Sequence, residues 1–245
     1  MNLLDINISN INDYKYYKIV CILYFIFIVI IFNTNILSYI FGNNISDIEL
    51  ELFIYGILLS GLVFLIIYPF IKIKLIILSK KKNLNKNILY DLLQSFELDE
   101  KTKKILKKIN EIIPVLFIII FIILSIYRKN INSISYFLIA ISIIFIIKCI
   151  LNYSTILPDI SEECRIRLLN GGCNDLLCSG HFSIVLLIYL LIVKFKMIKN
   201  TYSNYLLIIT ILYSIIPVLS KNHYTIDILV SLILVLLINK YIPNK

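Results

Sequence analysis

The sequence predicts an all-α protein, a polytopic bundle of helices that spans a membrane six or seven times. Of its 245 residues, 60% are hydrophobic, and the mean hydropathy is +0.91. The hydrophobic residues form long runs with few charges, which is the pattern of membrane-spanning helices. We therefore expect one integral membrane domain over residues 1–245. Residues 1–51 would form an N-terminal segment with an extra span, and residues 52–245 would form the transmembrane core.

Seven apolar segments are candidate spans. In chain order they are residues 19–41, 52–78, 112–127, 134–151, 182–193, 205–219 and 224–238. The second is long enough to cross the bilayer at a tilt. Pro114 falls in the first turn of the third, where proline is tolerated. Residues 101–110, just before it, are basic with one apolar side, so they fit an interfacial helix or a plain solvated one.

Basic residues predict the orientation of the bundle. Lysines follow the fifth and the seventh segments: Lys194, Lys196, Lys199, Lys240 and Lys245. The positive-inside rule places both groups in the cytosol, so the opposite ends of these segments face the exoplasm or a lumen. Arg128 and Lys129 agree with this orientation. The lysines within residues 80–108 do not, so either the N-terminus lies outside or one of the first three segments is re-entrant.

The net charge of +9 comes from lysines crowded into the loops. Such charge fits attraction to anionic lipid better than nucleic-acid binding. The sequence contains no glycine-rich phosphate loop and no zinc-ligand spacing. We therefore expect the lipid bilayer as a partner, with no nucleic acid, no metal and no cofactor.

The chain has two histidines, and each stands where a predicted span begins. Asp227 follows His223 by four residues, so on a helix the two side chains lie on one face. A carboxylate there can accept one ring N–H and leave the other ring nitrogen as a lone pair. A purely structural His–Asp pair is the alternative. At a membrane boundary the functional interpretation is favoured, because ionisable groups there are costly.

His181 follows Ser179 and Gly180 at the start of another predicted span. The N–H groups at a helix N-terminus bind anions, phosphate above all. Gly180 lets the backbone approach an anion closely. Ser179 fits an N-cap and a direct substrate contact equally well. Two histidines, one carboxylate and a helix N-terminus on one membrane face are typical of phosphoryl transfer through a phosphohistidine.

These residues resemble a known family. Ser-Gly-His at 179–181 and His-x-x-x-Asp at 223–227 resemble the type 2 phosphatidic acid phosphatase superfamily. The longer patterns, Cys-x-Asp-x-x-x-Ser-Gly-His at 173–181 and His-Tyr-Thr-x-Asp at 223–227, are similar to those of its sphingomyelin synthase branch. The resemblance covers about residues 89–238.

Two weaker likenesses lie upstream of these motifs. Residues 154–158 with Cys164 resemble a Leu-Pro segment of the synthase branch, and residues 91–96 resemble its first exoplasmic loop. Cys173 shares the exoplasmic loop with Cys164, and a disulfide between these two is one hypothesis.

The resemblance implies a six-helix lipid-phosphatase-like core and a ceramide phosphotransferase. The enzyme would move phosphocholine or phosphoethanolamine from a glycerophospholipid to ceramide and release diacylglycerol. His223 would attack the donor phosphorus, oriented by Asp227. His181 would protonate the departing diacylglycerol oxygen and then deprotonate the ceramide hydroxyl.

The expected substrate site is larger than this catalytic group. Besides Ser179 and Gly180, it includes Asp175 as a contact for a cationic headgroup and Tyr224 next to the second histidine. Arg165 and Arg167, with Lys221, are candidates to offset the phosphate charge, although each alone is more often a solvated loop cation.

Departures from the family pattern bear on specificity. The phosphatase branch carries a Ser-Arg pair where this chain has Ile216 and Pro217, and its lysine- and arginine-bearing first motif is absent. Both departures argue against a simple phosphatase. Asn174 and Cys178 replace a usual glycine and a usual aromatic residue of the synthase branch, so the headgroup stays open.

Two alternatives to the transferase remain: a lipid phosphate phosphatase, and a non-catalytic protein that binds ceramide or another lipid. The expected location is an endomembrane, in the Golgi or endoplasmic reticulum, or the plasma membrane, with an exoplasmic or lumenal site. Assembly into a homo-oligomer is a further expectation.

Overall fold

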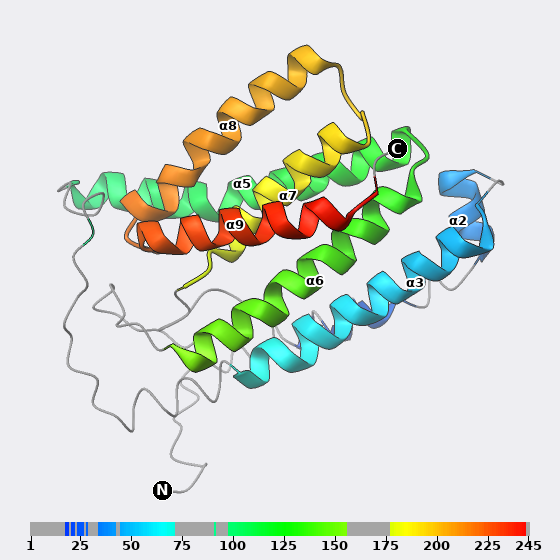
Figure 1. Ribbon diagram of the computed structural model, residues 1–245, viewed down its shortest axis with the longest axis horizontal. Helices are drawn as coiled ribbons and strands as arrows, with labels where there is room; N and C mark the ends of the chain where they lie inside the picture. The colour runs from blue at the N-terminus through cyan, green and yellow to red at the C-terminus, as the bar shows by residue number, and fades with distance from the viewer. Residues whose placement is uncertain are drawn as a thin grey trace, which may run out of the picture.

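The computed structural model describes residues 18–19, 21–22, 24–26, 28, 34–42, 45–71, 91, 98–155 and 177–243. All regular structure within these ranges is helical, which confirms the predicted all-α class (Figure 1). The principal helices are α2 (Thr34–Phe41), α3 (Asp47–Leu62), the π-helical η2 (Val63–Ile67), α5 (Glu100–Tyr127), α6 (Ile131–Ser154), α7 (Gly180–Lys194), α8 (Asn200–Leu219) and α9 (Thr225–Tyr241).

The bundle has the length and composition of a membrane protein. Four helical stretches are long and apolar enough to cross a bilayer: Asp47–Ile71, Glu100–Tyr127, Ile131–Ser154 and Asn200–Leu219. The apolar α7 is shorter, with 15 residues. The helical membrane bundle is thus confirmed, and the count of six or seven spans stays a prediction.

The first long stretch begins earlier than the apolar run predicts. Ser46 caps α3: its hydroxyl accepts the N–H of Glu49 at 3.3 Å, and the Glu49 carboxylate accepts the N–H of Ser46 at 3.2 Å. This reciprocal box satisfies two N–H groups that an uncapped helix would leave open, so the helix starts at Asp47. Near its other end the helix passes through η2 shortly before Pro69, which has no N–H for the helical ladder.

The basic residues 101–110 form the beginning of α5, continuous with the span, instead of a separate surface helix. Pro114 therefore lies in the helix interior and not in a first turn. A proline there leaves the carbonyl four residues earlier, that of Asn110, without its helical donor. The buried hydroxyl of Tyr213 on α8 lies 3.1 Å from that carbonyl oxygen and 2.9 Å from the Asn110 side-chain oxygen. A side chain of one helix thus compensates for the proline of another.

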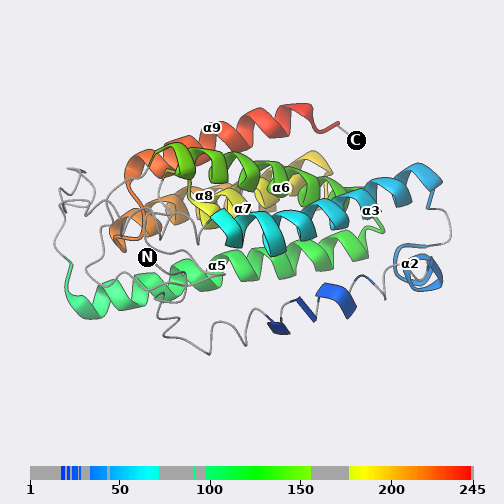
Figure 2. The same cartoon turned by 90° about the horizontal axis from the view of Figure 1, so that it is seen from below.

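The 15-residue apolar helix α7 lies at the centre of the bundle. Along α7, Val185, Leu187, Ile188 and Leu191 are completely buried. The helix packs against α5, α6, α8 and α9, while α3 packs along the other side of α6 (Figures 1 and 2). The start of α7 is consequently enclosed by other helices instead of facing lipid.

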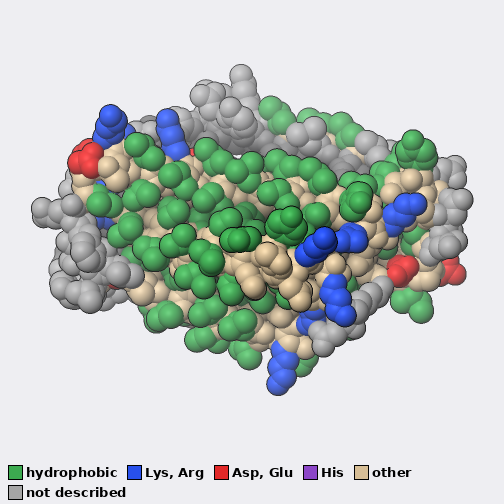
Figure 3. All heavy atoms as spheres, turned by 90° about the horizontal axis from the view of Figure 1, so that it is seen from above, with side chains coloured by type: hydrophobic (Ala, Val, Ile, Leu, Met, Phe, Trp, Pro, Cys, Tyr) green, Lys and Arg blue, Asp and Glu red, His purple; other side chains and the backbone are tan. Residues whose placement is uncertain are grey.

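The outward sides of the helices are apolar. Exposed isoleucine and leucine side chains line α5, α8 and α9, among them Ile119, Ile208, Ile211, Leu229 and Ile233. Figure 3 shows one such face, most of which is covered by hydrophobic side chains. A surface of this kind matches the hydrocarbon of a bilayer, and the polar core interactions lie behind it.

Basic side chains lie at both ends of the bundle. Arg128, after α5, donates to the Met197 carbonyl in the α7–α8 connection at 2.9 Å, and Lys194 of α7 donates to the Asn239 carbonyl of α9. The cations predicted to share one face therefore share one end. The start of α5 lies at the opposite end, together with the α8–α9 turn (Figure 1).

Candidate functional site

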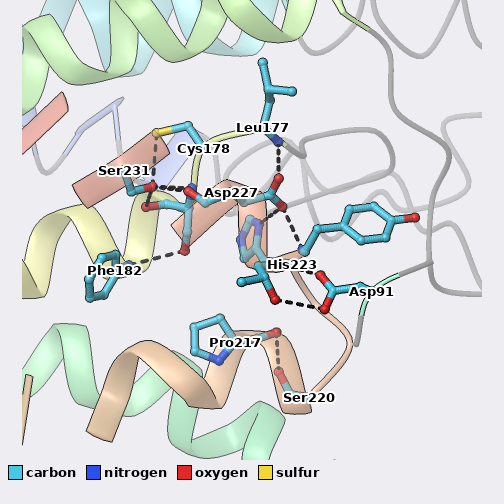
Figure 4. A network of polar contacts seen from close by, with 12 residues as sticks. Asp91, Leu177, Cys178, Phe182, Pro217, Ser220, His223, Asp227 and Ser231 are labelled. Carbon is cyan, nitrogen blue, oxygen red and sulfur yellow. Dashed lines mark hydrogen bonds and ion pairs between the residues drawn. The ribbon is translucent and has the colours of Figure 1, made fainter. Parts of the chain in front are cut away.

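Asp227 is the centre of a hydrogen-bond network at the start of α9 (Figure 4). Its side chain is completely buried and accepts from three donors. Nδ1 of His223 lies 3.0 Å from Oδ2, the Tyr224 N–H lies 2.9 Å from Oδ2, and the Leu177 N–H lies 2.8 Å from Oδ1. A carboxylate only accepts, so Nδ1 of His223 carries the proton in this pair. In the neutral imidazole, Nε2 then carries the lone pair, which is what a nucleophile requires.

The last turn of α8 holds the backbone of His223. The carbonyl of Pro217 accepts the N–H groups of Asn222 and His223 at 3.0 and 3.1 Å, and the Ser220 hydroxyl at 3.2 Å. Lys221 adopts a left-handed conformation with φ of 57°, which reverses the chain between the helices. Pro217, noted in the sequence as a departure from the phosphatase pattern, is thus the anchor of the histidine turn.

A second carboxylate meets the same helix start. Asp91 accepts the N–H of Thr225 at 2.6 Å and its hydroxyl at 2.8 Å. The two residues are 134 positions apart in the chain. Asp91 therefore ties the segment before α5 to the turn that carries His223, and it places a negative charge at a helix N-terminus, where the dipole favours it.

Hydrogen bonds join the start of α7 to α9. The Ser231 hydroxyl accepts the N–H of Ser179 at 2.7 Å and lies 2.7 Å from the carbonyl oxygen of Asp227. Just before Ser179, Leu177 has a positive φ of 94°, an uncommon conformation for a residue with a branched side chain. Its N–H is one of the three donors to Asp227. The network therefore holds the two predicted motifs side by side.

Ser179 and Gly180 each have a structural role at the start of α7. The Ser179 side chain accepts the N–H of Phe182 at 3.4 Å and is completely buried, so it acts as the N-cap of α7. A β-carbon at Gly180 would lie only 3.0 Å from the Phe145 ring. His181, the second residue of α7, is partly exposed. Their predicted contacts with substrate stay predictions.

The remaining predicted site residues fall into two groups. Tyr224 lies within the described residues and is buried, and its backbone N–H donates a hydrogen bond to Asp227. The other predicted substrate contacts and the two cysteines of the suggested disulfide lie outside the described residues: Asp175, Arg165, Arg167, Cys164 and Cys173. Cys178 has a free thiol that lies 3.4 Å from the Ser231 hydroxyl. Within the described ranges, no group of three or more His, Cys, Asp or Glu side chains is placed to hold a metal ion.

Reasoning from the sequence missed several residues of the network. Ser231 lies four residues after Asp227 and so extends the same helix face, a signal that was available. Asp91 stood within a weak likeness and had no assigned role. The bond from Leu177 is a backbone bond, and sequence patterns do not report which backbone group meets a side chain.

One comparison with known proteins gives a match. Residues 172–243 match the family model described as PAP2 superfamily C-terminal, and this stretch contains both histidines and Asp227. The match supports the type 2 phosphatidic acid phosphatase superfamily, whose members are typically phosphatases or phosphotransferases, and hence an enzyme with lipid-phosphate chemistry. Neither the curated proteins nor the solved structures yield a match.

Proposed function

We propose that the protein transfers a phospho-headgroup from a glycerophospholipid to ceramide, with His223 as nucleophile, Asp227 as its orienting carboxylate and His181 as acid and base. The observation that carries the proposal is the buried Asp227–His223 pair, joined by hydrogen bonds to the start of the helix that bears His181. The superfamily match supports the class of chemistry, and the longer sequence patterns favour the transferase over the hydrolase.

The first half-reaction forms the phosphohistidine. The Nε2 lone pair of His223 attacks the donor phosphorus while the bond from phosphorus to the diacylglycerol oxygen breaks. His181 gives its proton to that oxygen as diacylglycerol leaves. The Nδ1–H bond to Asp227 persists throughout and stabilises the positive ring, as the orienting acid of a triad does.

The second half-reaction returns both histidines to their starting states. His181, now neutral, takes the proton of the ceramide primary hydroxyl as its oxygen attacks phosphorus. The bond from phosphorus to Nε2 breaks, and its electron pair returns to His223. One acid–base residue serves both halves because the second half-reaction is the reverse of the first in form. In the first, an alcohol oxygen leaves phosphorus and gains a proton, and in the second, an alcohol oxygen loses a proton and attacks phosphorus.

Hydrolysis of a lipid phosphate is the second candidate, since the superfamily match does not distinguish water from ceramide as acceptor. Expression in a host without sphingomyelin, fed labelled ceramide, separates the two. A transferase yields a labelled sphingophospholipid, whose mass identifies the headgroup. A phosphatase yields free phosphate without labelled product, and a lipid-binding protein yields neither.

We also propose that the site faces the exoplasm or a lumen. The support is the group of cations at the opposite end of the bundle, including Arg128 and Lys194. Cysteines introduced at Asn222 and Lys196 should label differently with a membrane-impermeant maleimide. In intact cells, or vesicles with that face outward, position 222 should react and position 196 should not; the reverse pattern contradicts this orientation.

A further inference from the structure

Ser231 lies on α9, four residues after Asp227, and its side chain is completely buried. Its hydroxyl meets groups of α9 and of the segment that leads into α7 (Figure 4). Oγ donates to the Asp227 carbonyl oxygen at 2.7 Å and accepts the N–H of Ser179 at 2.7 Å. The carbonyl oxygen of Ser179 lies 3.2 Å from the same Oγ. None of the motifs discussed above includes Ser231.

The bond from Ser231 to Asp227 is common in helices, but the bond to Ser179 is not. A serine hydroxyl often donates to the carbonyl four residues earlier, and this bond slightly destabilises the helix. The stability of α9 therefore gives no reason for a hydroxyl here. Because a hydroxyl has one proton and two lone pairs, Ser231 can make that bond and still accept from Ser179. The Ser179 N–H also lies 3.4 Å from the Asp227 carbonyl oxygen, so the shorter of its two bonds depends on Ser231.

Ser231 provides the second of two links between α9 and the segment that leads into α7. The first is the bond from the Leu177 N–H to Oδ1 of Asp227, at 2.8 Å. On α9 the two linking residues are four positions apart, which is roughly 6 Å along the helix axis. One link would leave the segment free to turn about it, whereas two separated links fix its direction as well as its distance. Both links therefore set the first turn of α7, which carries His181, relative to His223.

We propose that Ser231 is a positioning residue of the phosphoryl transfer, which fixes the place of His181 relative to His223 by holding Ser179. The inference rests on the proposed function and deepens it by naming a residue that acts through His181. In the proposed reaction the attacking nitrogen and the leaving oxygen lie on opposite sides of phosphorus, so the two histidines must be held at a set separation. A misplacement of about 1 Å can lower a rate about 10²-fold.

The first test removes the hydroxyl alone. Ser231→Ala places a good helix former on α9 and leaves the side chains of Asp227 and His223 unchanged, so we expect a folded protein. We expect kcat to fall roughly 10- to 100-fold because His181 is displaced. KM for the phospholipid donor should change little, because the buried hydroxyl is not a substrate contact. Ser231→Thr keeps a hydroxyl and should retain more of the wild-type kcat.

Ser135→Ala is the matched control. Ser135, on α6, is also a completely buried serine, and its hydroxyl donates to the Ile131 carbonyl, four residues earlier, at 3.1 Å. That bond stays within one helix. The variant should keep the wild-type kcat, and cooperative thermal unfolding checks the fold of each variant. An equal fall of kcat in Ser135→Ala, or a wild-type kcat in Ser231→Ala, overturns the proposal.

The second test does not depend on turnover. The chain has two histidines, so modification by diethylpyrocarbonate, mapped by mass spectrometry, reports on His181 and His223 separately. In Ser231→Ala the modification rate of His181 should rise severalfold, because the first turn of α7 loses an anchor. The rate of His223 should stay the same, because its bond to Asp227 is kept. Ser135→Ala should match the wild type at both positions.

The two tests separate failure of this inference from failure of the proposed function. If the modification rates change as expected but the wild type shows no turnover, the proposed function fails and Ser231 remains the residue that positions His181. If His181 is modified at the wild-type rate in Ser231→Ala, Ser231 does not position His181 and the inference is overturned.

Discussion

The helix that follows His223 and the helix that contains His181 begin beside different polar groups. At the start of α9, two carboxylates accept backbone N–H groups: Asp227 from Tyr224 and Asp91 from Thr225. At the start of α7, the cap is the neutral hydroxyl of Ser179, and the nearby charged side chain is the ammonium of Lys148.

This difference assigns separate tasks to the two helix starts. A helix N-terminus is favourable for an anion. In α9 that place is taken by the protein's own carboxylates, which fix the turn that bears His223. At the start of α7 the cap is a neutral hydroxyl, so a carboxylate of the capping residue does not occupy that place. Under the proposed function, the start of α9 would orient His223 and the start of α7 would be the place for the substrate's phosphate.

We expect the largest effects on turnover from replacing the histidines. His223→Ala should lose both the phosphoenzyme and turnover, because no other group in the network offers a lone pair at that place. His181→Ala should also yield little product, although intermediate already formed can persist. Residues that act as a unit are non-additive, so each loss should approach the full catalytic effect. The assay is ceramide-dependent release of diacylglycerol at equal protein level. Wild-type turnover in both variants contradicts the enzyme and favours lipid binding.

Asp227→Asn should leave a folded protein that turns over roughly 10³- to 10⁴-fold more slowly. The amide can still accept one hydrogen bond, but its NH₂ group then faces a donor, Nδ1–H of His223 or the N–H of Tyr224. The ring loses its orienting charge and its fixed tautomer. Turnover and cooperative thermal unfolding, measured together, check this. A fall of less than tenfold shows that Asp227 only supports the helix end.

Gly180→Ala tests the other helix start. The added β-carbon would lie 3.0 Å from the Phe145 ring, and we expect a loss of about 1–3 kcal/mol of stability from overpacking. Turnover should fall about tenfold further, because the crowding falls at the α7 N-terminus. Gly56→Ala is the control. Gly56 lies in α3, and its β-carbon would lie 3.2 Å from the side chain of Leu138 on α6. Equal specific activity in the two variants removes the reason to link Gly180 with function.

Asp91→Ala should have the smallest effect. It removes a cap from α9 and should cost about 1 kcal/mol, with a loss of turnover of only a few-fold. Asp99→Ala removes the N-cap of α5, where Asp99 accepts the Thr102 N–H at 3.1 Å, and serves as a matched control. We expect similar losses of thermal stability in both variants, with reduced turnover in Asp91→Ala alone. If turnover is identical in Asp91→Ala and Asp99→Ala, Asp91 does not help to orient His223.

The sequence predicted the parts of the site that follow a helical period. The spacing of His223 and Asp227, and the small residues before His181, were sufficient to name the core of the network. The helical membrane bundle followed from apolar runs and charge. These features are local, so a single stretch of sequence contains them.

The parts that were missed depend on contacts between distant segments. Asp91 reaches Thr225 across 134 positions, and Lys148 meets Gly180 only once α6 and α7 pack together. The sequence shows Lys148 as a lysine within an apolar span, but it does not show that Lys148 lies next to Gly180. The unbroken α5 was missed because Pro114 favours a helix start, and the compensating hydroxyl of Tyr213 comes from another helix.

The contact between Tyr213 and Asn110 has a mechanical consequence. It fixes the register of α5 and α8, because a one-residue slide would strand the carbonyl that Pro114 leaves open. About two turns beyond Tyr213, α8 ends in the turn that carries His223, and the exposed lysines at the start of α5 lie at this same end of the bundle (Figure 1). A displacement of that basic end, caused by headgroups or by a neighbouring molecule, would therefore be passed through the Tyr213–Asn110 contact to the turn that carries His223.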